Sequence, residues 1–482
     1  MGVLSNLEPK EVFYYFEELC KIPHGSFHTK QISDYCVNFA KEHNLVYYQD
    51  EANNVIIVKE ATPGYEGAPA VIIQGHLDMV CEKEADCPID FEKDGLDLQI
   101  DGDLVLAKGT TLGGDDGAAV AYGLALLASA DIPHPKLEVV LTADEEVGML
   151  GAEAIDLSVL EGRMLINIDS EEEGIFLTSC AGGLRANMEL PVSRIREEGI
   201  AYELIVEGMA GGHSGTEIDK GHGNSNKIMG RLLYTVNQKA ELQIETLAGG
   251  QKDNAIPRKT IASVLVKEED CDVFEAAVKE IEEILKKEQR IGDPNFHVTL
   301  TKKEKTEARV LDRSSRTQVL MVLLLIPDGV QAMSMELPGL VETSLNLGIL
   351  SLEEDVLKMS SAVRSSVGTA KEFLAEKLAA FMEYAGGTIS IAGDYPAWEF
   401  QPESRIREVF TEAYEEMYGK KPLIQAIHAG LECGLLSNKL PGLDCISLGP
   451  DMSGVHTTEE RLSISSTKRT WELLLEVLKR LK

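Results

Sequence analysis

The segment from Val71 to Met79 constrains the fold of this chain more strongly than any other stretch. It begins with three β-branched apolar residues, which are typical of a buried strand, and it runs into His76-Leu77-Asp78. A buried strand that ends in an imidazole and a carboxylate delivers both groups to the edge of a sheet, where open α/β folds place their sites. Alone this evidence is weak, because a histidine at a strand end is more often an ordinary surface or hydrogen-bonded residue.

Comparable apolar segments alternate with helical patterns in the first third of the chain and again near its end. The predicted strands are 54–59, 70–74, 137–142, 164–168 and 444–448, and the predicted helices are 9–20, 29–43, 118–130, 404–418 and 465–481. An Asp-Gly-Asp turn at 101–103 predicts a hairpin. Strands that alternate with helices predict an α/β domain built on a doubly wound, mostly parallel sheet.

The pattern changes after Gly183. Between residues 184 and 391 the strand and helix patterns, which include a predicted strand at 297–302, are those of a smaller α+β domain, and the α/β pattern resumes afterwards. We therefore expect residues 1–183 and 392–482 to form the two parts of one domain, with 184–391 inserted between them. A chain of 482 residues is also too long for one ordinary core.

Composition excludes two classes of partner. The net charge of −34, from 46 basic and 80 acidic residues, repels nucleic acid and anionic membranes, and otherwise indicates only solubility. The N-terminus shows no signal peptide, and the longest apolar run, 319–326, is too short to span a bilayer. The eight cysteines include no C-x-x-C pair and are interpreted as reduced thiols. These features predict a cytoplasmic protein.

Seven polar side chains follow the predicted strands or stand near a predicted helix: His76, Asp78, Asp115, Glu145, Glu146, Asp169 and His456. Two imidazoles with several carboxylates suit zinc, cobalt or manganese, and a bridging carboxylate would let three acids serve two ions. The adjacent pair Glu145-Glu146 can direct one carboxylate to a metal and leave the other as a general base. Each acid taken singly has an ordinary alternative, such as a helix cap, a solvated turn or a loop position.

The glycine-rich segment 109–117, which precedes the predicted helix 118–130, has a second interpretation as a phosphate-binding loop. It lacks the Lys-Ser/Thr of a Walker motif, and Asp115-Asp116 would repel an anion. A cation site is therefore the better interpretation.

Five short motifs resemble those of the co-catalytic dinuclear zinc peptidases, a family that includes carnosinase, aminopeptidase T and carboxypeptidase G. They are His76-Leu77-Asp78-Met79, Gly114-Asp115-Asp116-Gly117, Asp144-Glu145-Glu146-Val147-Gly148, Asn167-Ile168-Asp169 and Gly454-Val455-His456. Longer strings around residues 74–83, 341–348 and 428–434 resemble the aminoacyl-histidine dipeptidases (Xaa-His dipeptidases, peptidase D) over nearly the whole length.

The resemblance implies a role for each motif. His76, Asp115 and Asp169 would hold one metal ion, and His456, Glu146 and the bridging Asp115 would hold the other. Asp78 would orient His76, and Glu145 would act as the general base. The peptide bond between Asp115 and Asp116 is typically cis in such enzymes.

The inserted domain would then be a lid. Within Gly211-Gly212-His213-Ser214-Gly215, His213 matches the family's histidine that polarises the scissile carbonyl, although a merely flexible glycine loop is the alternative. Arg364 fits the arginine that pairs with the substrate's C-terminal carboxylate, which a guanidinium can bind through two hydrogen bonds. Asn254 is a weaker substrate-binding candidate. In relatives with this lid, pairing of the lids makes a homodimer, so a homodimer is expected here.

The expected activity is hydrolysis of Xaa-His dipeptides such as carnosine by a metal-bound water, with two divalent ions, zinc above all, per chain. A general dipeptidase, a tripeptide aminopeptidase or an N-acyl amino-acid deacylase would use the same chemistry. A non-catalytic metal-binding scaffold is a rival of a different class. Glu145 argues against it, because a structural site has no use for a free carboxylate beside the metals.

Overall fold

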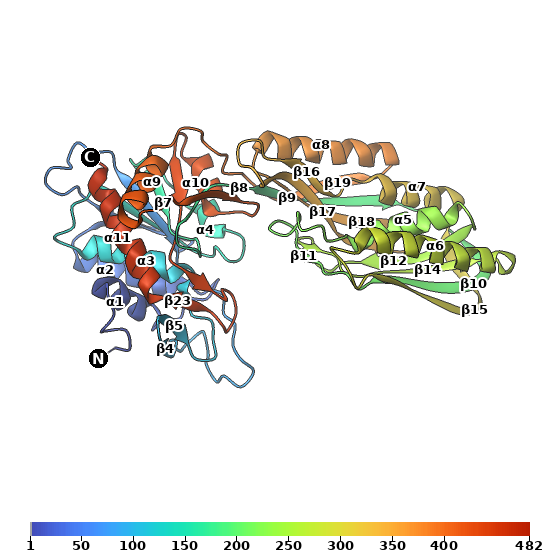
Figure 1. Ribbon diagram of the computed structural model, residues 1–482, viewed down its shortest axis with the longest axis horizontal. Coiled ribbons are helices and arrows are strands. Elements are labelled where there is room, and N and C mark those ends of the chain that lie inside the picture. Colours follow the sequence, from blue (N-terminus) through green and yellow to red (C-terminus); the bar gives the residue numbers. More distant parts are fainter. Residues whose placement is uncertain (1) are drawn as a thin grey trace. The chain divides into compact units, whose positions relative to one another are not determined.

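The computed structural model describes residues 2–482, which form two compact units (Figure 1). The first comprises the residues up to Cys180 together with Phe400–Ala426 and Leu431–Lys482. The second comprises Ala181–Glu399 and the short segment Ile427–Gly430. The second unit is therefore an insertion into the sequence of the first, and the chain re-enters it once more near residue 428.

An eight-stranded sheet in the order β1-β2-β6-β3-β7-β21-β8-β20 forms the centre of the first unit. Its four middle strands, β6, β3, β7 and β21, are parallel, whereas β1, β2 and β8 pair antiparallel beside them. The expected α/β fold is thus confirmed, with the parallel part at the middle of the sheet. The strands are β1 (Val46–Gln49), β2 (Val55–Lys59), β3 (Val71–His76), β6 (Leu137–Thr142), β7 (Met164–Asn167), β8 (Ile175–Cys180), β20 (Leu423–Ile427) and β21 (Asp444–Ser447).

Alternating side chains of the middle strands pack into different layers, because successive residues of a strand point to opposite faces. Val71 and Ile73 of β3 join the main apolar core with residues of four helices. These are α1 (Lys10–Leu19), α2 (Lys30–Glu42), α3 (Gly114–Ala128) and α11 (Ile464–Arg480). A fifth helix, α9 (Arg405–Tyr418), contributes to the same core. Gln74 points to the other face, where it meets Glu432, the first residue of α10 (Glu432–Lys439).

Close packing of α3 on β3 explains the glycine that precedes His76. A Cβ atom at Gly75 would collide with the Cβ atom of Ala119 and with the carboxylate of Asp116. Any larger residue would push α3 away from the strand end, so Gly75 keeps the loop before α3 close to His76.

The predicted hairpin at residues 101–103 joins β4 (Leu98–Asp101) to β5 (Leu104–Ala107). These strands belong to a small four-stranded sheet with β22 (Met452–Ser453) and β23 (Arg461–Ser463). A short helix, α4 (Leu150–Ala154), lies between β6 and β7. No strand was predicted at β1 or β20, which are short and have no fully buried residue, or at β8, although β8 has six residues and is mostly buried.

The second unit is an antiparallel sheet of nine strands with four helices. Eight strands follow the order β15-β10-β14-β12-β17-β18-β9-β19, and β16 pairs with β17. Their bounds are β9 (Gly182–Pro191), β10 (Arg194–Glu207), β12 (Leu242–Gly249), β14 (Thr260–Val266), β15 (His297–Leu311), β16 (Gly329–Met333), β17 (Val341–Leu352), β18 (Val356–Ser365) and β19 (Thr388–Tyr395). A two-residue ribbon pairs β11 (Gly212–His213) with β13 (Ala255–Ile256).

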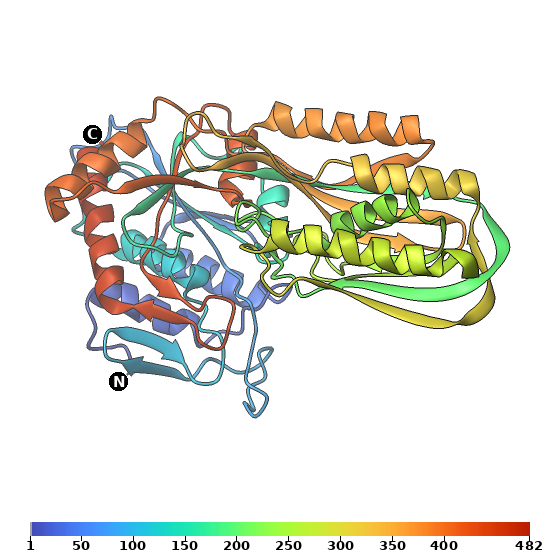
Figure 2. The ribbon, with the colours of Figure 1, turned by 45° about the vertical axis from the view of Figure 1, so that its right-hand side comes forward.

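One apolar core holds the helices of the second unit to its sheet (Figure 2). The helices are α5 (Ser225–Asn237), α6 (Cys271–Gln289), α7 (Arg313–Leu325) and α8 (Gly368–Ala385), with a 3₁₀ turn at Glu268–Asp270. Burial alternates along β10, where Tyr202, Leu204 and Val206 are buried and the residues between them are not. This unit is the α+β insertion that the sequence predicts.

No helix within residues 2–482 combines the length and the apolar character that crossing a membrane requires.

Candidate active site

Three neighbouring strands carry candidate ligands at their carboxyl ends. In the order β6-β3-β7, His76 ends β3, Glu145 and Glu146 follow β6, and Asp169 follows β7. The Nε2 atom of His76 lies 3.8 Å from Oδ1 of Asp169. Because the strands are parallel and adjacent, residues far apart in sequence meet at one edge of the sheet.

Asp115 lies between the two histidines. Its Oδ1 atom is 2.9 Å from Nε2 of His76, and its Oδ2 atom is 3.2 Å from Nε2 of His456. The same nitrogen of His456 is 2.8 Å from Oε1 of Glu146. One carboxylate therefore contacts both imidazoles through different oxygens, which is the arrangement that a bridging ligand needs.

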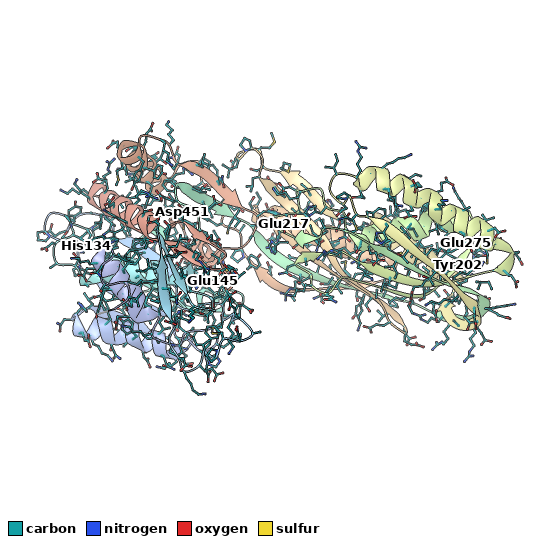
Figure 3. The ribbon with its side chains drawn as sticks, turned by 60° about the horizontal axis from the view of Figure 1, so that its bottom comes forward. His134, Glu145, Tyr202, Glu217, Glu275 and Asp451 are labelled. Carbon is teal, nitrogen blue, oxygen red and sulfur yellow. The ribbon has the colours of Figure 1, made fainter. Side chains whose placement is uncertain are left out.

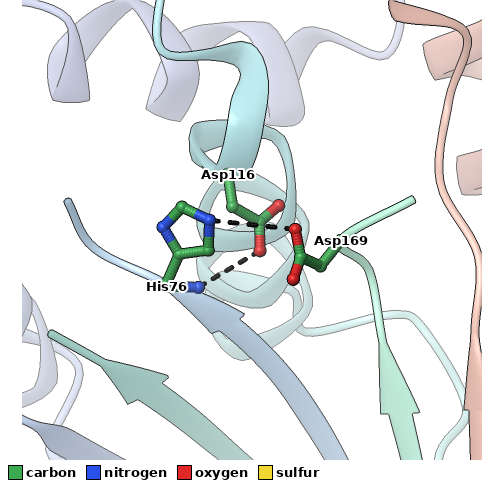
Figure 4. A group of neighbouring side chains, drawn as sticks. All are labelled: His76, Asp116 and Asp169. Carbon is green, nitrogen blue, oxygen red and sulfur yellow. Dashed lines mark hydrogen bonds and ion pairs between the residues drawn. The ribbon is translucent and has the colours of Figure 1, made fainter. Parts of the chain in front are cut away.

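Asp116 also approaches His76 and Asp169, as Figure 4 shows. One of its oxygens accepts the backbone N–H of His76 at 3.1 Å, and the other accepts the N–H of Ala119 at 3.4 Å in the first turn of α3. Asp116 thus holds the strand to the helix, whereas Asp115 contacts both imidazoles. The peptide bond between the two residues is cis.

Asp78 positions two elements at once. The Nδ1 atom of His76 lies 3.0 Å from the Asp78 carbonyl oxygen and 3.6 Å from its carboxylate. The carboxylate also accepts the backbone N–H groups of Glu145 at 2.9 Å and of Glu146 at 3.3 Å. Asp78 therefore fixes the imidazole and the turn that bears both glutamates.

The charges of the cluster are unbalanced. Burial raises the pKa of Glu145 to about 8, with further contributions from the charges of Glu432 and Glu146. Burial and the charge of Asp115 raise the pKa of Asp169 well above its ordinary value. Burial lowers the pKa of His76, but hydrogen bonds to Asp115 and Asp78 outweigh it and raise that pKa well above normal.

Hydrogen bonds with Asp115 and Glu146 likewise raise the pKa of His456 to about 10. Crowded carboxylates repel one another, and the protons held by these acids and by the neighbouring imidazoles offset that repulsion. Bound cations would relieve this repulsion, and the mixed nitrogen and oxygen donors fit a divalent metal centre.

Two loops of the site are held in unusual backbone geometry. Asp144 and His456 have φ angles of 55° and 62°, in the left-handed region that non-glycine residues rarely adopt. The buried carboxylate of Glu460 accepts the backbone N–H groups of Leu112, Gly113 and Gly114 at 2.7, 3.1 and 2.8 Å. Glu460 thereby ties the loop after His456 to the loop that carries Asp115.

His213 and Arg364 lie together within the second unit. The Nδ1 atom of His213 accepts the backbone N–H groups of Gly215 and Thr216 at 3.3 and 3.2 Å, which leaves the proton of the neutral ring on Nε2. Nε2 is 3.4 Å from Nη2 of Arg364. Burial and the nearby guanidinium lower the pKa of His213. The His213 ring and the Arg364 guanidinium thus lie side by side as two hydrogen-bond donors.

Arg364 is buried without a counter-ion. Its Nη1 atom donates to the Tyr395 hydroxyl at 3.0 Å, while its buried Nε has no hydrogen-bond partner among residues 2–482. No carboxylate of the described chain lies within ion-pair distance of it. A buried guanidinium without a counter-ion is costly, and an anionic ligand would supply that counter-ion.

Asn254, His428 and Ser344 complete this part of the second unit. The Asn254 carbonyl accepts the N–H of Ser214 at 2.9 Å, so its loop lies beside His213, although the structure gives its side chain no contact. His428 Nε2 is 2.7 Å from Ser344 Oγ, and burial together with the charge of Arg364 lowers the pKa of His428 to about 4. A Cβ atom at Gly215 would meet the His428 carbonyl, His213 and Arg364, so the glycine permits this close packing.

Sequence reasoning did not assign roles to Asp116, Glu432, Glu460, His428 or Ser344. Glu432, His428 and Ser344 do stand in the strings that carry the subfamily resemblance, so that signal was present without a role. Glu460 follows His456 by four residues, but no local pattern marks a glutamate that binds a distant loop.

Comparison with known proteins places this arrangement in a family. The cytosol non-specific dipeptidase of Escherichia coli (strain K12) is 37% identical over 481 residues, which cover 99% of each chain. The chain belongs to the M20 peptidase family. It is accordingly a hydrolase that acts on peptide bonds. The family's peptidase dimerisation domain matches residues 206–293 of this M20 peptidase, within the second unit.

Solved structures agree with this membership. The crystal structure of aminoacylhistidine dipeptidase from Vibrio alginolyticus is 37% identical, covers 99% of this chain and 98% of its own, and superposes with a TM-score of 0.92. An aminopeptidase from Bacillus cereus, 16% identical, superposes with a TM-score of 0.57 over 98% of this chain and 99% of its own. At that identity the second match shows a shared fold only.

Proposed function

We propose that this M20 peptidase is a metal-dependent dipeptidase that hydrolyses Xaa-His dipeptides. The observation that carries the proposal is the meeting of His76, Asp115, Glu146, Asp169 and His456 at one sheet edge with Glu145 beside them. The E. coli relative is named a dipeptidase and the Vibrio relative an aminoacylhistidine dipeptidase, which supports this substrate class.

His76, Asp115 and Asp169 would hold one divalent ion, and His456, Glu146 and Asp115 the other. Zinc suits this donor set best, and cobalt or manganese fits it as well. When bound, the ions would polarise the scissile carbonyl and lower the pKa of a water molecule. Asp78 keeps the His76 ring and the Glu145-Glu146 turn in place.

Glu145 (labelled in Figure 3) would accept a proton from the attacking water and return it to the leaving amine. Its carboxylate makes no hydrogen bond to another group within residues 2–482, whereas Glu146 contacts His456 at 2.8 Å. This difference supports proton transfer for Glu145 and ligation for Glu146.

The second unit would bind the rest of the dipeptide. The Nε2 atom of His213, which lies 3.4 Å from Nη2 of Arg364, would donate its proton to the scissile carbonyl, because Nδ1 accepts backbone N–H groups. Glu217, labelled in Figure 3, accepts the His213 backbone N–H at 2.7 Å and steadies this loop. Arg364 would pair with the substrate's C-terminal carboxylate, and Asn254 would contribute from the adjoining loop.

The same comparisons support a proposal for assembly and location. The matched dimerisation domain supports a homodimer formed through the second unit, and the name of the E. coli relative supports a cytoplasmic location. The net charge of −34 makes nucleic acid and anionic membranes poor partners.

A dipeptide panel with and without a chelator tests the proposal. We expect hydrolysis of β-Ala-His and Gly-His, loss of that activity by roughly a thousandfold or more after metal removal, and recovery with zinc, cobalt or manganese. Equal rates on Gly-Leu and Gly-His would favour a general dipeptidase. Cleavage of tripeptides or N-acyl amino acids in preference would favour the other two rivals, and full activity of metal-free protein would refute the proposed chemistry.

Arg364→Ala should lower kcat/KM for free dipeptides by roughly 10- to 100-fold, the value of hydrogen bonds to a charged group. It should matter far less for dipeptide amides, since these lack the carboxylate. The measurement is kcat/KM on each free and amidated pair.

Arg316→Ala provides the control. Arg316 is also a buried arginine of the second unit, but it pairs with Glu241 at 2.6 Å. Its loss should cost stability without changing the ratio of free to amidated substrate. Equal losses on both substrates for Arg364→Ala would remove that residue from the carboxylate pocket.

A further inference from the structure

Three polar side chains are buried at or near the carboxyl ends of mostly apolar parallel strands. Gln74 of β3, Thr142 of β6 and Asn167 of β7 are each 0% exposed. In register, Gln74 lies opposite Asn167, and Thr142 lies opposite His76. Strands buried on both faces are normally continuous apolar runs, so these three residues depart from the expected pattern.

The three residues form a hydrogen-bonded network that is joined by Glu432. Oε2 of Glu432 accepts the Gln74 amide at 2.5 Å and the Thr142 hydroxyl at 2.7 Å. The Asn167 amide in turn donates to Oε1 of Gln74 at 2.7 Å. Glu432 is itself 0% exposed, and α10 begins with it. One carboxylate from a distant part of the chain thereby connects β3 to β6 directly, and β7 joins the network through Gln74.

The network lies directly before the candidate metal centre in each strand. Gln74 precedes His76 by two residues within β3, so their side chains share a face of the sheet, and Asn167, the last residue of β7, precedes Asp169 by two. Thr142 precedes Glu145 by three residues. The strand ends that Glu432 connects are therefore the ones that carry a ligand from β3, a ligand from β7 and the general base after β6.

Stability does not account for this network. Oε1 of Glu432 and Oδ1 of Asn167 are buried without a hydrogen-bond partner among residues 2–482, which costs free energy. Apolar residues of similar shape would fill the same space at little or no cost. A buried polar network with unsatisfied atoms therefore points to a need for fixed geometry.

We propose that Glu432 is a positioning residue that sets the relative places of His76, Glu145 and Asp169 by cross-linking the ends of β3, β6 and β7. The inference rests on the metal centre of the proposed function. It assigns Glu432 no contact with substrate. Partners that orient ligands from behind typically change metal affinity or activity by 10- to 100-fold when they are lost.

Co²⁺ titration of the metal-free protein tests the proposal without turnover. For Glu432→Ala we expect Co²⁺ affinity to fall roughly 10- to 100-fold, with a changed visible absorption spectrum of the bound ion. After reloading at saturating Co²⁺, kcat should fall by a similar factor while KM changes less. Glu432→Gln keeps an oxygen that can accept from both Gln74 and Thr142, so its affinity should stay within roughly threefold of the wild type.

Glu138→Ala is the matched control. Glu138 is a fully buried glutamate near the start of β6, where its carboxylate accepts the backbone N–H groups of Glu161 and Gly162 at 2.8 and 2.9 Å. Its loss should lower the melting temperature and leave Co²⁺ affinity and spectrum unchanged. The same result for Glu432→Ala would overturn the proposal, because its role would then be structural only.

Thr142→Val covers the case in which Glu432→Ala does not fold. Valine keeps the shape of threonine and removes only the hydroxyl that donates to Glu432. A reduced Co²⁺ affinity supports the positioning role, and wild-type affinity together with a wild-type spectrum refutes it. Wild-type protein that binds no Co²⁺ would instead refute the metal centre itself, so the two failures are distinguishable.

Discussion

Glu145→Ala should lower kcat by roughly 10²- to 10⁴-fold, the range typical of a lost general base, while the bound metal remains close to the wild-type amount. The reason is geometric. Glu146 contacts His456 and clusters with Asp115, whereas Glu145 clusters with His76 and Glu146 but its carboxylate makes no hydrogen bond within residues 2–482. Metal analysis and single-turnover kinetics on the same preparation make the measurement.

Glu146→Ala is the natural companion, since it differs by one position and should lose metal. If Glu145→Ala loses metal while Glu146→Ala remains active, the two acids have been assigned the wrong way round. If both variants keep metal and activity, neither residue has the role that we propose for it.

Asp115→Ala should lose metal and activity together, with turnover reduced by roughly a thousandfold or more because electrostatic stabilisation by the ions is worth several kcal/mol. Asp115 contacts His76 at 2.9 Å and His456 at 3.2 Å, so its removal affects both halves of the centre. Metal content per chain and activity on Gly-His are the two measurements.

The variant Asp116→Asn distinguishes the role of Asp115 from that of its neighbour Asp116. Asp116 accepts backbone N–H groups of His76 and Ala119, and asparagine keeps one acceptor oxygen for this task. This variant should retain most of its metal. Metal loss in Asp116→Asn with retention in Asp115→Ala would show that Asp116 is the ligand.

The middle strands of the first sheet could be predicted from sequence, because the runs of apolar residues there begin and end close to the bounds of the observed strands. The prediction for residues 137–142 is the observed β6, Leu137–Thr142. By contrast, β1 is exposed along its whole length and carries no burial pattern. The predicted strand at 297–302 extends to Leu311 in β15, because its charged second half pairs with β10 as an exposed edge. Charged residues at an edge strand look like a loop in sequence.

Four of the five candidate ligands stand where a buried strand ends or a helix begins, a position that can be recognised in sequence, whereas His456 lies in the loop between β22 and β23. The residues that hold the ligands in place could not be predicted. Glu460 bonds to Leu112–Gly114 from almost the other end of the chain, and Glu432 bonds to Gln74 and Thr142. Such a partner is defined only by tertiary proximity, and a single sequence has no local period that reveals it.

The short return of residues Ile427–Gly430 into the second unit limits how far the lid can be treated as an exchangeable module. A chimera that swaps only Ala181–Glu399 for the equivalent part of a relative would bring a new Ser344 position but keep the old His428. The two side chains of this 2.7 Å contact would then come from two different proteins. Four residues beyond His428, the same stretch supplies Glu432 to the first sheet. Grafts between members of this family should therefore carry 427–430 with the lid and leave 431–439 with the recipient.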